Sequence, residues 1–296
     1  MTTLSILLPH YNDPKGFELS LRSIESQTWN GSREIVVCDD GSHPKELGEL
    51  ERICDATSAT VKLLRNERNR GRPYTRNVLL DAAAGKYTAW LDSGDEWYPD
   101  KIQQQLNGLY RARHQDFAKD VWCTTNYDWQ WAGTKKRIRK QNVDGDQLGS
   151  MLTGSLGAYL WTILGTTDSF RAVGHFDLEL TRLQDLDFFI RFLSKDGMLI
   201  LPPTADPLVV YHKSDIGKNG EEISRCFNYV LDKHSAQLFT RSRRFRRNRR
   251  YHVNMHAARF TDNNDESLRT AMYLGRAALN SPVAFVRHMV RNKGRL

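Results

Sequence analysis

Acidic side chains occur in three short clusters whose composition suits catalysis. Asp39-Asp40-Gly41-Ser42 and Asp92-Ser93-Gly94-Asp95 each follow an apolar run. Either cluster alone is typical of a turn. Two carboxylates within a few residues also suit a divalent cation, which prefers oxygen ligands and can hold a diphosphate. Gln184-Asp185-Leu186-Asp187 begins a predicted helix, where the dipole favours acidic residues, and one of these carboxylates could be a general base.

The segments before these clusters predict a parallel sheet. Residues 4–8, 34–38, 60–64 and 87–91 are short apolar runs with little alternation, as in strands buried on both faces. Stretches of helical period separate them, which is typical of an α/β fold. Ligands of such sheets bind beyond the carboxyl ends of the strands. We therefore expect the first two clusters, with the polar residues 9–13, on one rim of the sheet.

The pattern changes after Pro99, and the chain is helical after residue 220. We predict a helix over 101–113, a strand over 121–125, a hairpin-like stretch over 129–141, a helix over 185–194 and strands over 198–201 and 208–211. We accordingly expect an α/β domain over residues 1–215, with flanking helices around a central sheet, and a basic helical extension over 216–296.

Charge is divided unequally along the chain. Residues 213–296 hold 18 Lys or Arg and 7 Asp or Glu, a net charge of +11, whereas residues 1–212 carry −3. No apolar run reaches the ~18–20 residues of a membrane-spanning helix, and the N-terminus does not resemble a secretory signal. The four cysteines stand far apart without metal-site or disulfide spacing. We expect a soluble, cytoplasmic protein.

Six segments carry motifs in a fixed order. They are 5–12 (SILLPHYN), 23–28 (SIESQT), 34–42 (EIVVCDDGS), 69–77 (NRGRPYTRN), 85–101 (with LDSGDEWYPDK) and 173–188 (with VGHFD and QDLDF). Together they resemble the family 2 glycosyltransferases, inverting enzymes of the nucleotide-sugar-binding GT-A fold. The resemblance covers about residues 4–212. It implies a Rossmann-like, mostly parallel sheet and sugar transfer from a nucleotide donor, UDP-linked, to a glycan or lipid-linked acceptor in cell-surface polysaccharide biosynthesis.

The resemblance also implies which residues bind the donor. Pro9 and Tyr11 would line the base pocket, and Asp39 would hydrogen-bond the base. Arg72 would stand near the base or the phosphates and stabilise the departing diphosphate.

A divalent cation, Mn²⁺ or Mg²⁺, is implied at the next motif. Asp92, with Ser93 beside it, begins the family's Asp-x-Asp element, which holds the ribose and the metal. The second aspartate of that element falls on Gly94, which has no side-chain ligand, and Asp95 follows at once as a replacement. His212 is either a further ligand or a surface residue.

Asp185 aligns with the family's general base. The family commonly has Glu before this Asp, and here Gln184 removes one negative charge, so Asp185 should ionise more readily. Asp187 is the alternative base, but it lies two positions on and on another helical face.

Two other functions remain open. A sugar-nucleotide pyrophosphorylase would need a Gly-rich loop with a basic residue after the first strand, which residues 9–12 lack. A degenerate nucleotide-binding module is the non-enzymatic alternative, and Gly94 is the residue that favours it.

The extension contains seven arginines among residues 241–250. Leu231, Leu238 and Phe245 recur every seven residues and predict an apolar seam along one basic helix. The arginines could form a solvated face, contact an anionic membrane or bind nucleic acid. We expect peripheral contact with the inner membrane surface through 241–250 and no nucleic acid, because no aromatic-interleaved binding module accompanies the arginines.

Overall fold

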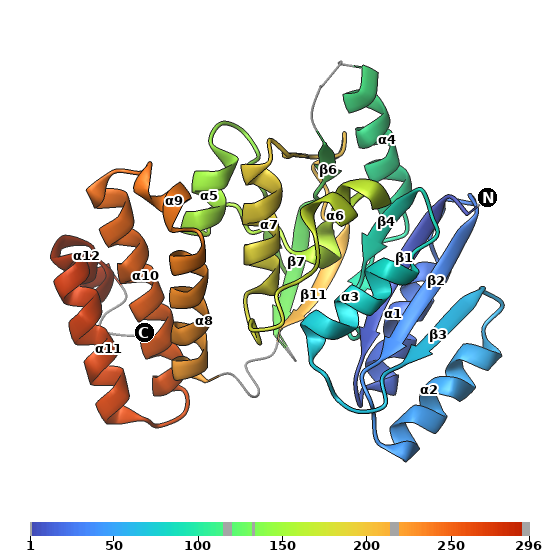
Figure 1. The fold of residues 1–296 in the computed structure, drawn as a ribbon, viewed down its shortest axis with the longest axis horizontal. Helices are drawn as coiled ribbons and strands as arrows, with labels where there is room; N and C mark the ends of the chain where they lie inside the picture. The colour runs from blue at the N-terminus through green and yellow to red at the C-terminus, as the bar shows by residue number, and fades with distance from the viewer. Residues whose placement is uncertain (1, 115–119, 132–133, 214–218, 292–296) are drawn as a thin grey trace. The chain divides into compact units, whose positions relative to one another are not determined.

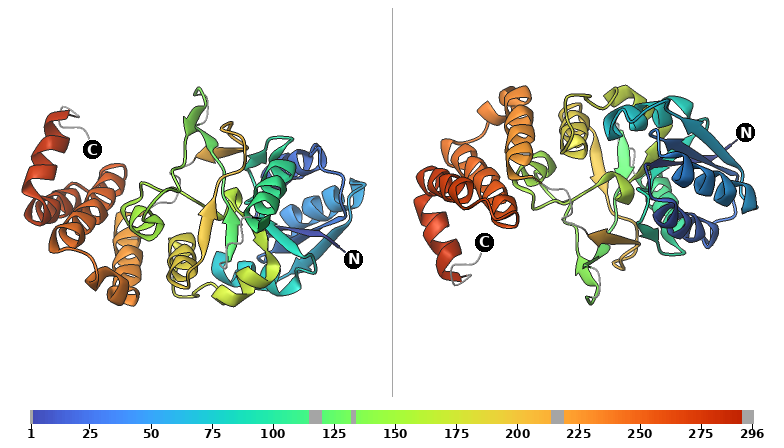
Figure 2. Two further views of the ribbon diagram at one scale, coloured as in Figure 1. Left: turned by 90° about the horizontal axis from the view of Figure 1, so that it is seen from above. Right: turned by 90° about the horizontal axis from the view of Figure 1, so that it is seen from below.

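The computed structural model describes residues 2–114, 120–131, 134–213 and 219–291. The chain divides into two compact units, Met1–Ser214 and Asp215–Leu296 (Figures 1 and 2). The first unit contains both sheets, and the described part of the second consists of helices and their connections.

A seven-stranded sheet forms the centre of the first unit. Its order is β10 (Met198–Ile200), β6 (Val121–Cys123), β9 (Leu164–Thr166), β4 (Tyr87–Trp90), β1 (Leu4–His10), β2 (Arg33–Asp39) and β3 (Val61–Arg65). Strands β4, β1, β2 and β3 are parallel, and β9 is antiparallel to both β4 and β6. The predicted mostly parallel sheet is confirmed. Because β1 lies between β2 and β4, the strand order reverses beside it, and such a switch point leaves a crevice for ligands.

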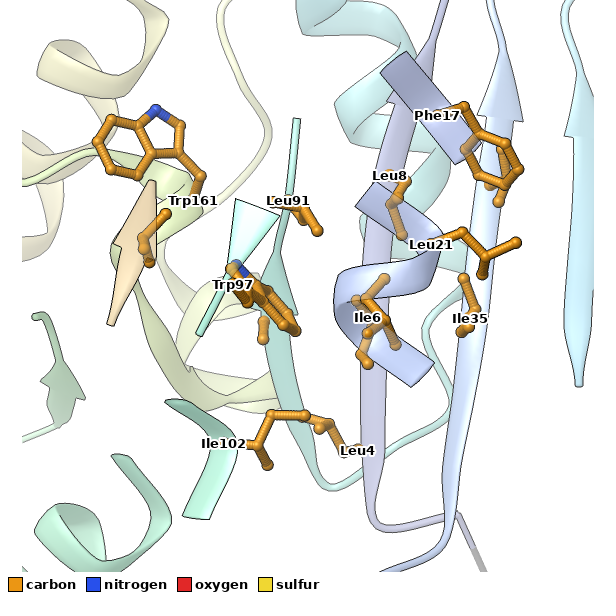
Figure 3. Close-up of a cluster of buried hydrophobic side chains, with 14 of the residues drawn as sticks. Leu4, Ile6, Leu8, Phe17, Leu21, Ile35, Leu91, Trp97, Ile102 and Trp161 are labelled. Carbon is orange, nitrogen blue, oxygen red and sulfur yellow. The ribbon is translucent and has the colours of Figure 1, made fainter. Parts of the chain in front are cut away.

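Helices cover both faces of this sheet. Helices α1 (Pro14–Glu25), α2 (Pro44–Ala56) and α4 (Lys101–His114) pack on one face through a core that includes Ile6, Phe17 and Ile102 (Figure 3). Helices α3 (Arg72–Ala82), α5 (Gln147–Thr153), α6 (Thr167–Val173) and α7 (Gln184–Ser194) bring apolar side chains to a second core on the other face.

Side-chain alternation assigns each strand-end residue to one of the two faces. Ile35 and Val37 of β2 belong to the α1 core, whereas Val36 and Cys38 belong to the α3 core. Alternate side chains of a strand point to opposite faces. Asp39 therefore continues the α1 series and Asp40 the α3 series.

A second sheet has the order β5 (Glu96–Trp97), β11 (Val209–Lys213), β7 (Tyr127–Trp131) and β8 (Arg137–Arg139). Strands β7 and β8 are antiparallel, as the hairpin-like pattern predicted, and β11 is parallel to β7. A short 3₁₀ helix, η1 (Leu160–Thr162), precedes β9. Strand β5 follows directly after the cluster that begins at Asp92, and β11 pairs with β5.

The second unit contains α8 (Gly220–Lys233), α9 (Ser235–Phe239), α10 (Arg243–Asp262), α11 (Ser267–Asn280) and α12 (Pro282–Arg291). Helices α8 and α11 pack against α10, and Ala257, Ala258 and Tyr273 form a small core. The predicted helical extension is confirmed. None of the described helices has the length and apolar character needed to cross a membrane.

The predicted single seam is wrong, because its residues lie in three helices. Leu231 is in α8, Leu238 in α9 and Phe245 in α10. Helix α8 ends at Lys233, and Ser242 caps a new helix by accepting a hydrogen bond from the Phe245 amide at 3.1 Å. The capping residue Ser242 starts a new helix, although the apolar residues recur every seven positions across the boundary.

Several arginines of 241–250 support the fold of this unit. Arg247 donates to the carbonyl oxygens of Asn280 (3.0 Å) and Leu279 (3.3 Å) at the end of α11. Arg246 donates to backbone carbonyls, and Arg249 is 5 % exposed with its guanidinium 4.8 Å from the Phe227 ring centroid. The run is therefore not a uniform solvated face.

Candidate active site

A pocket of about 210 Å³ lies at the carboxyl ends of β1, β2 and β4, beside the switch point. It is lined by Pro9, His10, Tyr11, Asp13, Asp40, Arg72, Thr75, Asp92 and Ser93. Five residues predicted to bind the donor are thus brought together: Pro9, Tyr11, Arg72, Asp92 and Ser93. Asp39, which was predicted to contact the base, does not line the pocket.

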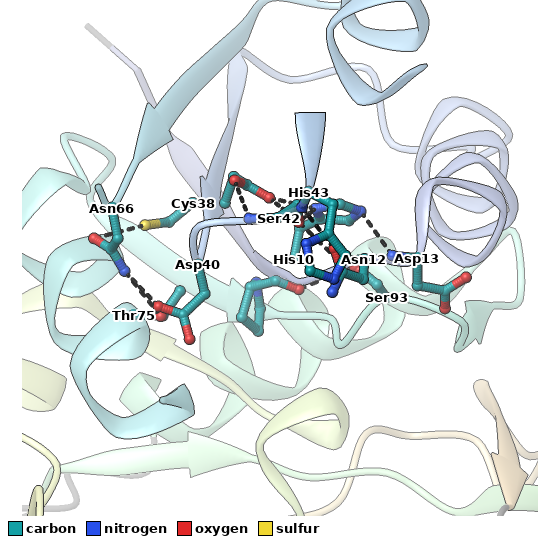
Figure 4. Close-up of polar contacts among 12 residues, drawn as sticks. His10, Asn12, Asp13, Cys38, Asp40, Ser42, His43, Asn66, Thr75 and Ser93 are labelled. Carbon is teal, nitrogen blue, oxygen red and sulfur yellow. Dashed lines mark hydrogen bonds and ion pairs between the residues drawn. The ribbon is translucent and has the colours of Figure 1, made fainter. Parts of the chain in front are cut away.

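Hydrogen bonds join the three loops of the rim (Figure 4). The Asn12 amide donates to Ser42 Oγ at 2.8 Å, and Asn12 Oδ1 accepts from the His43 amide at 2.9 Å. Ser93 Oγ donates to the Pro9 carbonyl oxygen at 2.9 Å. Each loop is held by another, so the pocket wall is fixed by the fold.

Asp39 supports the pocket from behind. Its fully buried carboxylate accepts hydrogen bonds from His10 Nδ1 at 2.8 Å and from the Ser42 amide and hydroxyl. Burial alone would raise the pKa of Asp39, but the hydrogen bonds from His10 and Ser42 outweigh it and lower that pKa. His10 Nε2 accepts from the Asp13 amide at 3.3 Å, which places the ring proton on Nδ1. The pair thereby orients the loop that contributes Asp13.

Asp40 faces the pocket instead, and sequence reasoning missed it. Its carboxylate accepts hydrogen bonds from Asn66 Nδ2 (2.8 Å) and from the amides of Arg70 (2.9 Å) and Gly71 (2.8 Å). Asp40 thus lines the pocket and fixes the loop before α3, which carries Arg72. Asp40 directly follows Asp39, so the two side chains point to opposite sides, but the unalternating run over 34–38 does not show which side faces the pocket.

Arg76 connects the pocket to α7, and it too was not predicted. Nη2 donates to both carboxylate oxygens of Asp92 at 3.1 Å, and Nη1 donates to Asp185 Oδ1 at 2.7 Å and Gln184 Oε1 at 2.9 Å. Its side chain is 3 % exposed. Burial alone would lower the pKa of Arg76, but the charges of Asp185 and Asp92 outweigh it and raise that pKa.

Asp185 and Asp187 differ in what surrounds them. Asp185 is 20 % exposed, and its second oxygen accepts from the Leu160 amide at 3.2 Å. Asp187 has no exposed side-chain surface and accepts from Arg191 Nε at 3.0 Å. Solvent can therefore reach the Asp185 carboxylate but not that of Asp187.

The two predicted cation ligands do not share the pocket. Asp92 lines it with a side chain that is 27 % exposed, whereas Asp95 is 5 % exposed and accepts from the His212 amide at 3.0 Å. Burial, reinforced by the charge of Asp92, raises the pKa of Asp95 well above its ordinary value. His212 Nε2 pairs with Glu96 at 2.7 Å. Asp95 and His212 thus link the loop after β4 to β11.

Asp13 is the acidic side chain next to Gly94. A Cβ built on Gly94, whose φ is +95°, would stand 3.7 Å from Asp13 Oδ2, and Asp13 lines the pocket with Asp92. Nowhere in the described ranges do three or more His, Cys, Asp or Glu side chains gather as a complete cation site. Asp92 and Asp13 nevertheless supply the carboxylate oxygens that Mn²⁺ and Mg²⁺ prefer.

Aromatic rings lie beside Asp185. Tyr159, 41 % exposed, precedes the Leu160 amide that binds Asp185, and its ring stacks on Trp161 with centroids 5.1 Å apart. Trp161 stacks in turn on Tyr211, also at 5.1 Å. The stack presents a flat, partly exposed ring close to the Asp185 carboxylate.

Comparison with known proteins gives a family match. The model of the family described as glycosyl transferase family 2 matches residues 5–160. The amylovoran biosynthesis glycosyltransferase AmsB of Erwinia amylovora is 26 % identical over 211 residues, covering 71 % of this chain and 69 % of AmsB. The UDP-Glc:α-D-GlcNAc-diphosphoundecaprenol β-1,3-glucosyltransferase WfgD of Escherichia coli is 33 % identical over 108 residues, covering 36 % of this chain. That match spans 41 % of WfgD, less than half of its length.

Solved structures share the fold. Residues 1–349 of S. aureus TarS in complex with UDP-GlcNAc give a TM-score of 0.59 at 15 % identity, covering 99 % of this chain and 92 % of that one. The mannosyltransferase PcManGT of Pyrobaculum calidifontis, in complex with GDP-Man and Mn²⁺, gives 0.60 at 13 % identity, covering 98 % and 79 %. Both have the GT-A architecture.

Proposed function

We propose, because the chain belongs to glycosyltransferase family 2, that it transfers a sugar with inversion from a UDP-sugar to a hydroxyl of a glycan or lipid-linked acceptor in cell-surface polysaccharide synthesis. One observation carries the proposal: the Arg76 guanidinium binds both Asp92, in the pocket, and Asp185, beside it. A donor-binding carboxylate and a candidate base therefore share one rigid support.

The donor nucleotide is assigned to the pocket at β1, β2 and β4. The exposed Tyr11 ring offers a surface on which the base can stack, and the Asp40 carboxylate can accept a hydrogen bond from a base N–H. This role was predicted for Asp39 and moves to its neighbour. Arg72, at the pocket rim, can pair with the diphosphate.

Asp185 acts as the general base. It takes the proton of the acceptor hydroxyl while that oxygen attacks the anomeric carbon from the side opposite the nucleotide. The bond between the anomeric carbon and the phosphate oxygen breaks, and its electron pair leaves with the nucleoside diphosphate. The Arg76 and Leu160 donors orient the Asp185 carboxylate, which supports this role.

A substitution at Asp185 tests the proposal. Asp185→Asn should lower release of UDP from UDP-sugars by at least about 10²-fold, because an amide cannot accept the proton. Binding of UDP, measured by calorimetry, should stay unchanged. Asp55→Asn, on exposed α2 surface at the opposite sheet face, is the matched control.

Three results would contradict the proposal. Retention of more than about a tenth of the activity by Asp185→Asn would remove Asp185 as base. Formation of pyrophosphate from UTP and a sugar phosphate would indicate a nucleotidyltransferase. Binding of UDP-sugars without any release of UDP would indicate a binding module.

The divalent cation is assigned to Asp92 and Asp13. When bound, the cation would stabilise the negative charge on the leaving diphosphate. The position of Asp13 beside Gly94 supports this pair over the predicted pair of Asp92 and Asp95. Donor phosphates and water can complete the oxygen ligands.

Calorimetry of UDP binding with and without Mn²⁺ tests the ligand set. Asp92→Ala and Asp13→Ala should each remove most of the Mn²⁺-dependent gain in affinity. Asp95→Ala should keep that gain and instead lower the melting temperature, because the His212 amide loses its buried partner. Equal losses of Mn²⁺-dependent binding in Asp92→Ala and Asp95→Ala, with none in Asp13→Ala, would restore the original pair.

A further inference from the structure

The end of the chain is basic without any acidic residue. Residues 267–296 contain six Lys or Arg and no Asp or Glu. Helices α11 and α12 occupy most of this segment. Arg269 pairs with Glu221 and Glu266, which lie outside the segment, and no acidic residue within the segment compensates the other five basic residues.

Helix α12 leaves an apolar face without cover. Within α12, all of whose residues the structure describes, no side chain is buried. Val283, Val286 and Val290 are 71 %, 59 % and 75 % exposed. Their spacing of three and four residues places them on one side of the helix over about 10 Å. Phe285 and Met289, on other sides, are half-buried, so packing on α11 does not use the valine face.

Arginines border this face. Arg287 and Arg291 are exposed, and with Pro282 and the three valines they line one shallow, almost wholly apolar hollow. We propose that this α12 face, apolar in the middle and cationic at its edge, lies on the surface of an anionic lipid bilayer. Helices that lie in a membrane interface combine an apolar face with Lys or Arg in this way.

Charge selects lipid over a second copy of the chain. A two-fold contact through this face would bring together two copies of the same patch, each carrying Arg287 and Arg291, with no acidic residue of 267–296 to compensate. Anionic lipid offers opposite charge and an apolar layer in one partner. The proposal does not depend on the donor chemistry above.

The segment proposed here to contact the membrane differs from the one predicted from sequence. Contact was expected through 241–250, where Arg246, Arg247 and Arg249 are engaged by the fold of the unit. Arg243, Arg244 and Arg250 are exposed there, but large apolar side chains do not alternate with them on an open face. They can add long-range attraction, whereas α12 offers surface that lipid can cover.

Flotation of the full chain with vesicles tests the proposal. The protein should float with vesicles of phosphatidylcholine and phosphatidylglycerol at low salt, and far less with phosphatidylcholine alone. Combining Val286→Ser with Val290→Ser should weaken binding roughly tenfold, since each loses apolar contact with the acyl boundary. Combining Arg287→Gln with Arg291→Gln should weaken it and reduce its salt dependence.

Two control variants match these changes. Leu178→Ser removes an apolar side chain that is 57 % exposed in the first unit. Arg243→Gln with Arg244→Gln removes two exposed charges outside α12. Neither should change the bound fraction by more than about twofold. Circular dichroism melts of all variants show whether each is folded.

Four outcomes would overturn the proposal. The wild-type chain could fail to float with anionic vesicles at low salt. The valine variant could bind like wild type while folded. The Arg243 and Arg244 variant could lose as much binding as the Arg287 and Arg291 variant, which would indicate diffuse charge. Sedimentation could reveal a dimer that the valine variant dissociates, which would make the face an interface between copies.

Discussion

The Arg76 side chain has two charged partners and a rigid, planar head. Its two terminal nitrogens point at different carboxylates, and Nε is buried without a hydrogen-bond partner among the described residues. Guanidinium geometry allows one side chain to hold two carboxylates in fixed directions. We therefore infer that Arg76 is a positioning residue, which would act through Asp92 and through the proposed base Asp185.

Arg76→Lys tests this assignment. An ammonium group keeps the charge but cannot reproduce the fork, so kcat should fall about 10²-fold through Asp185, and KM for the donor should rise through Asp92. Arg72→Lys is the matched control, because Arg72 is exposed at the pocket rim, and it should act mainly on donor KM. Steady-state kinetics with a melting curve for each variant checks both. A normal kcat in folded Arg76→Lys would contradict the positioning role.

At the end of α11, backbone carbonyl groups receive hydrogen bonds from a side chain of another helix. The last carbonyl groups of a helix lack partners within it, and Arg247 of α10 donates to two of them, those of Leu279 and Asn280. Arg247 is exposed, and this contact nevertheless gives it a structural role. It also holds the point from which α12 departs.

Removal of this side chain should loosen α11. Arg247→Ala should lower the stability of the helical unit by about 1 kcal/mol, through loss of hydrogen bonds from a charged donor. Arg244→Ala, with an exposed side chain in the same turn, should change it by less than about 0.5 kcal/mol. Hydrogen exchange of the α11 amides measures the difference. Equal exchange in the two variants would mean that Arg247 is not needed as a cap.

The sequence predicts more of the architecture of the whole chain than of the candidate site. Unalternating apolar runs, each followed by polar residues, identify the parallel strands and the rim where the pocket lies. The same lack of alternation hides which side chains face which helix layer. The resemblance implied that Asp39 contacts the base, whereas the neighbouring Asp40 continues the α3 side of β2 and lines the pocket.

Long-range partners explain the remaining differences. Arg76 contacts Asp92 and Asp185, and Asp95 is buried against β11. The residues next to Arg76 and Asp95 in the sequence do not predict these contacts. In the helical unit, the arginines of 241–250 could not be told apart from sequence, because the sequence does not show which of them contacts the end of another helix. Composition gave the sign of the charge, and the fold decides where it is exposed.

The two Arg76 contacts close chain loops of very different length. Arg76 and Asp92 are 16 residues apart, whereas Arg76 and Asp185 are 109 apart. Closing the longer loop costs more chain entropy, and a chain emerging from the ribosome presents its N-terminal part first. The strands whose ends line the pocket, together with Arg76 and Asp92, are therefore synthesised before α7. A nascent chain that ends before residue 185 already contains all nine residues that line the pocket but lacks Asp185, the carboxylate proposed as the base.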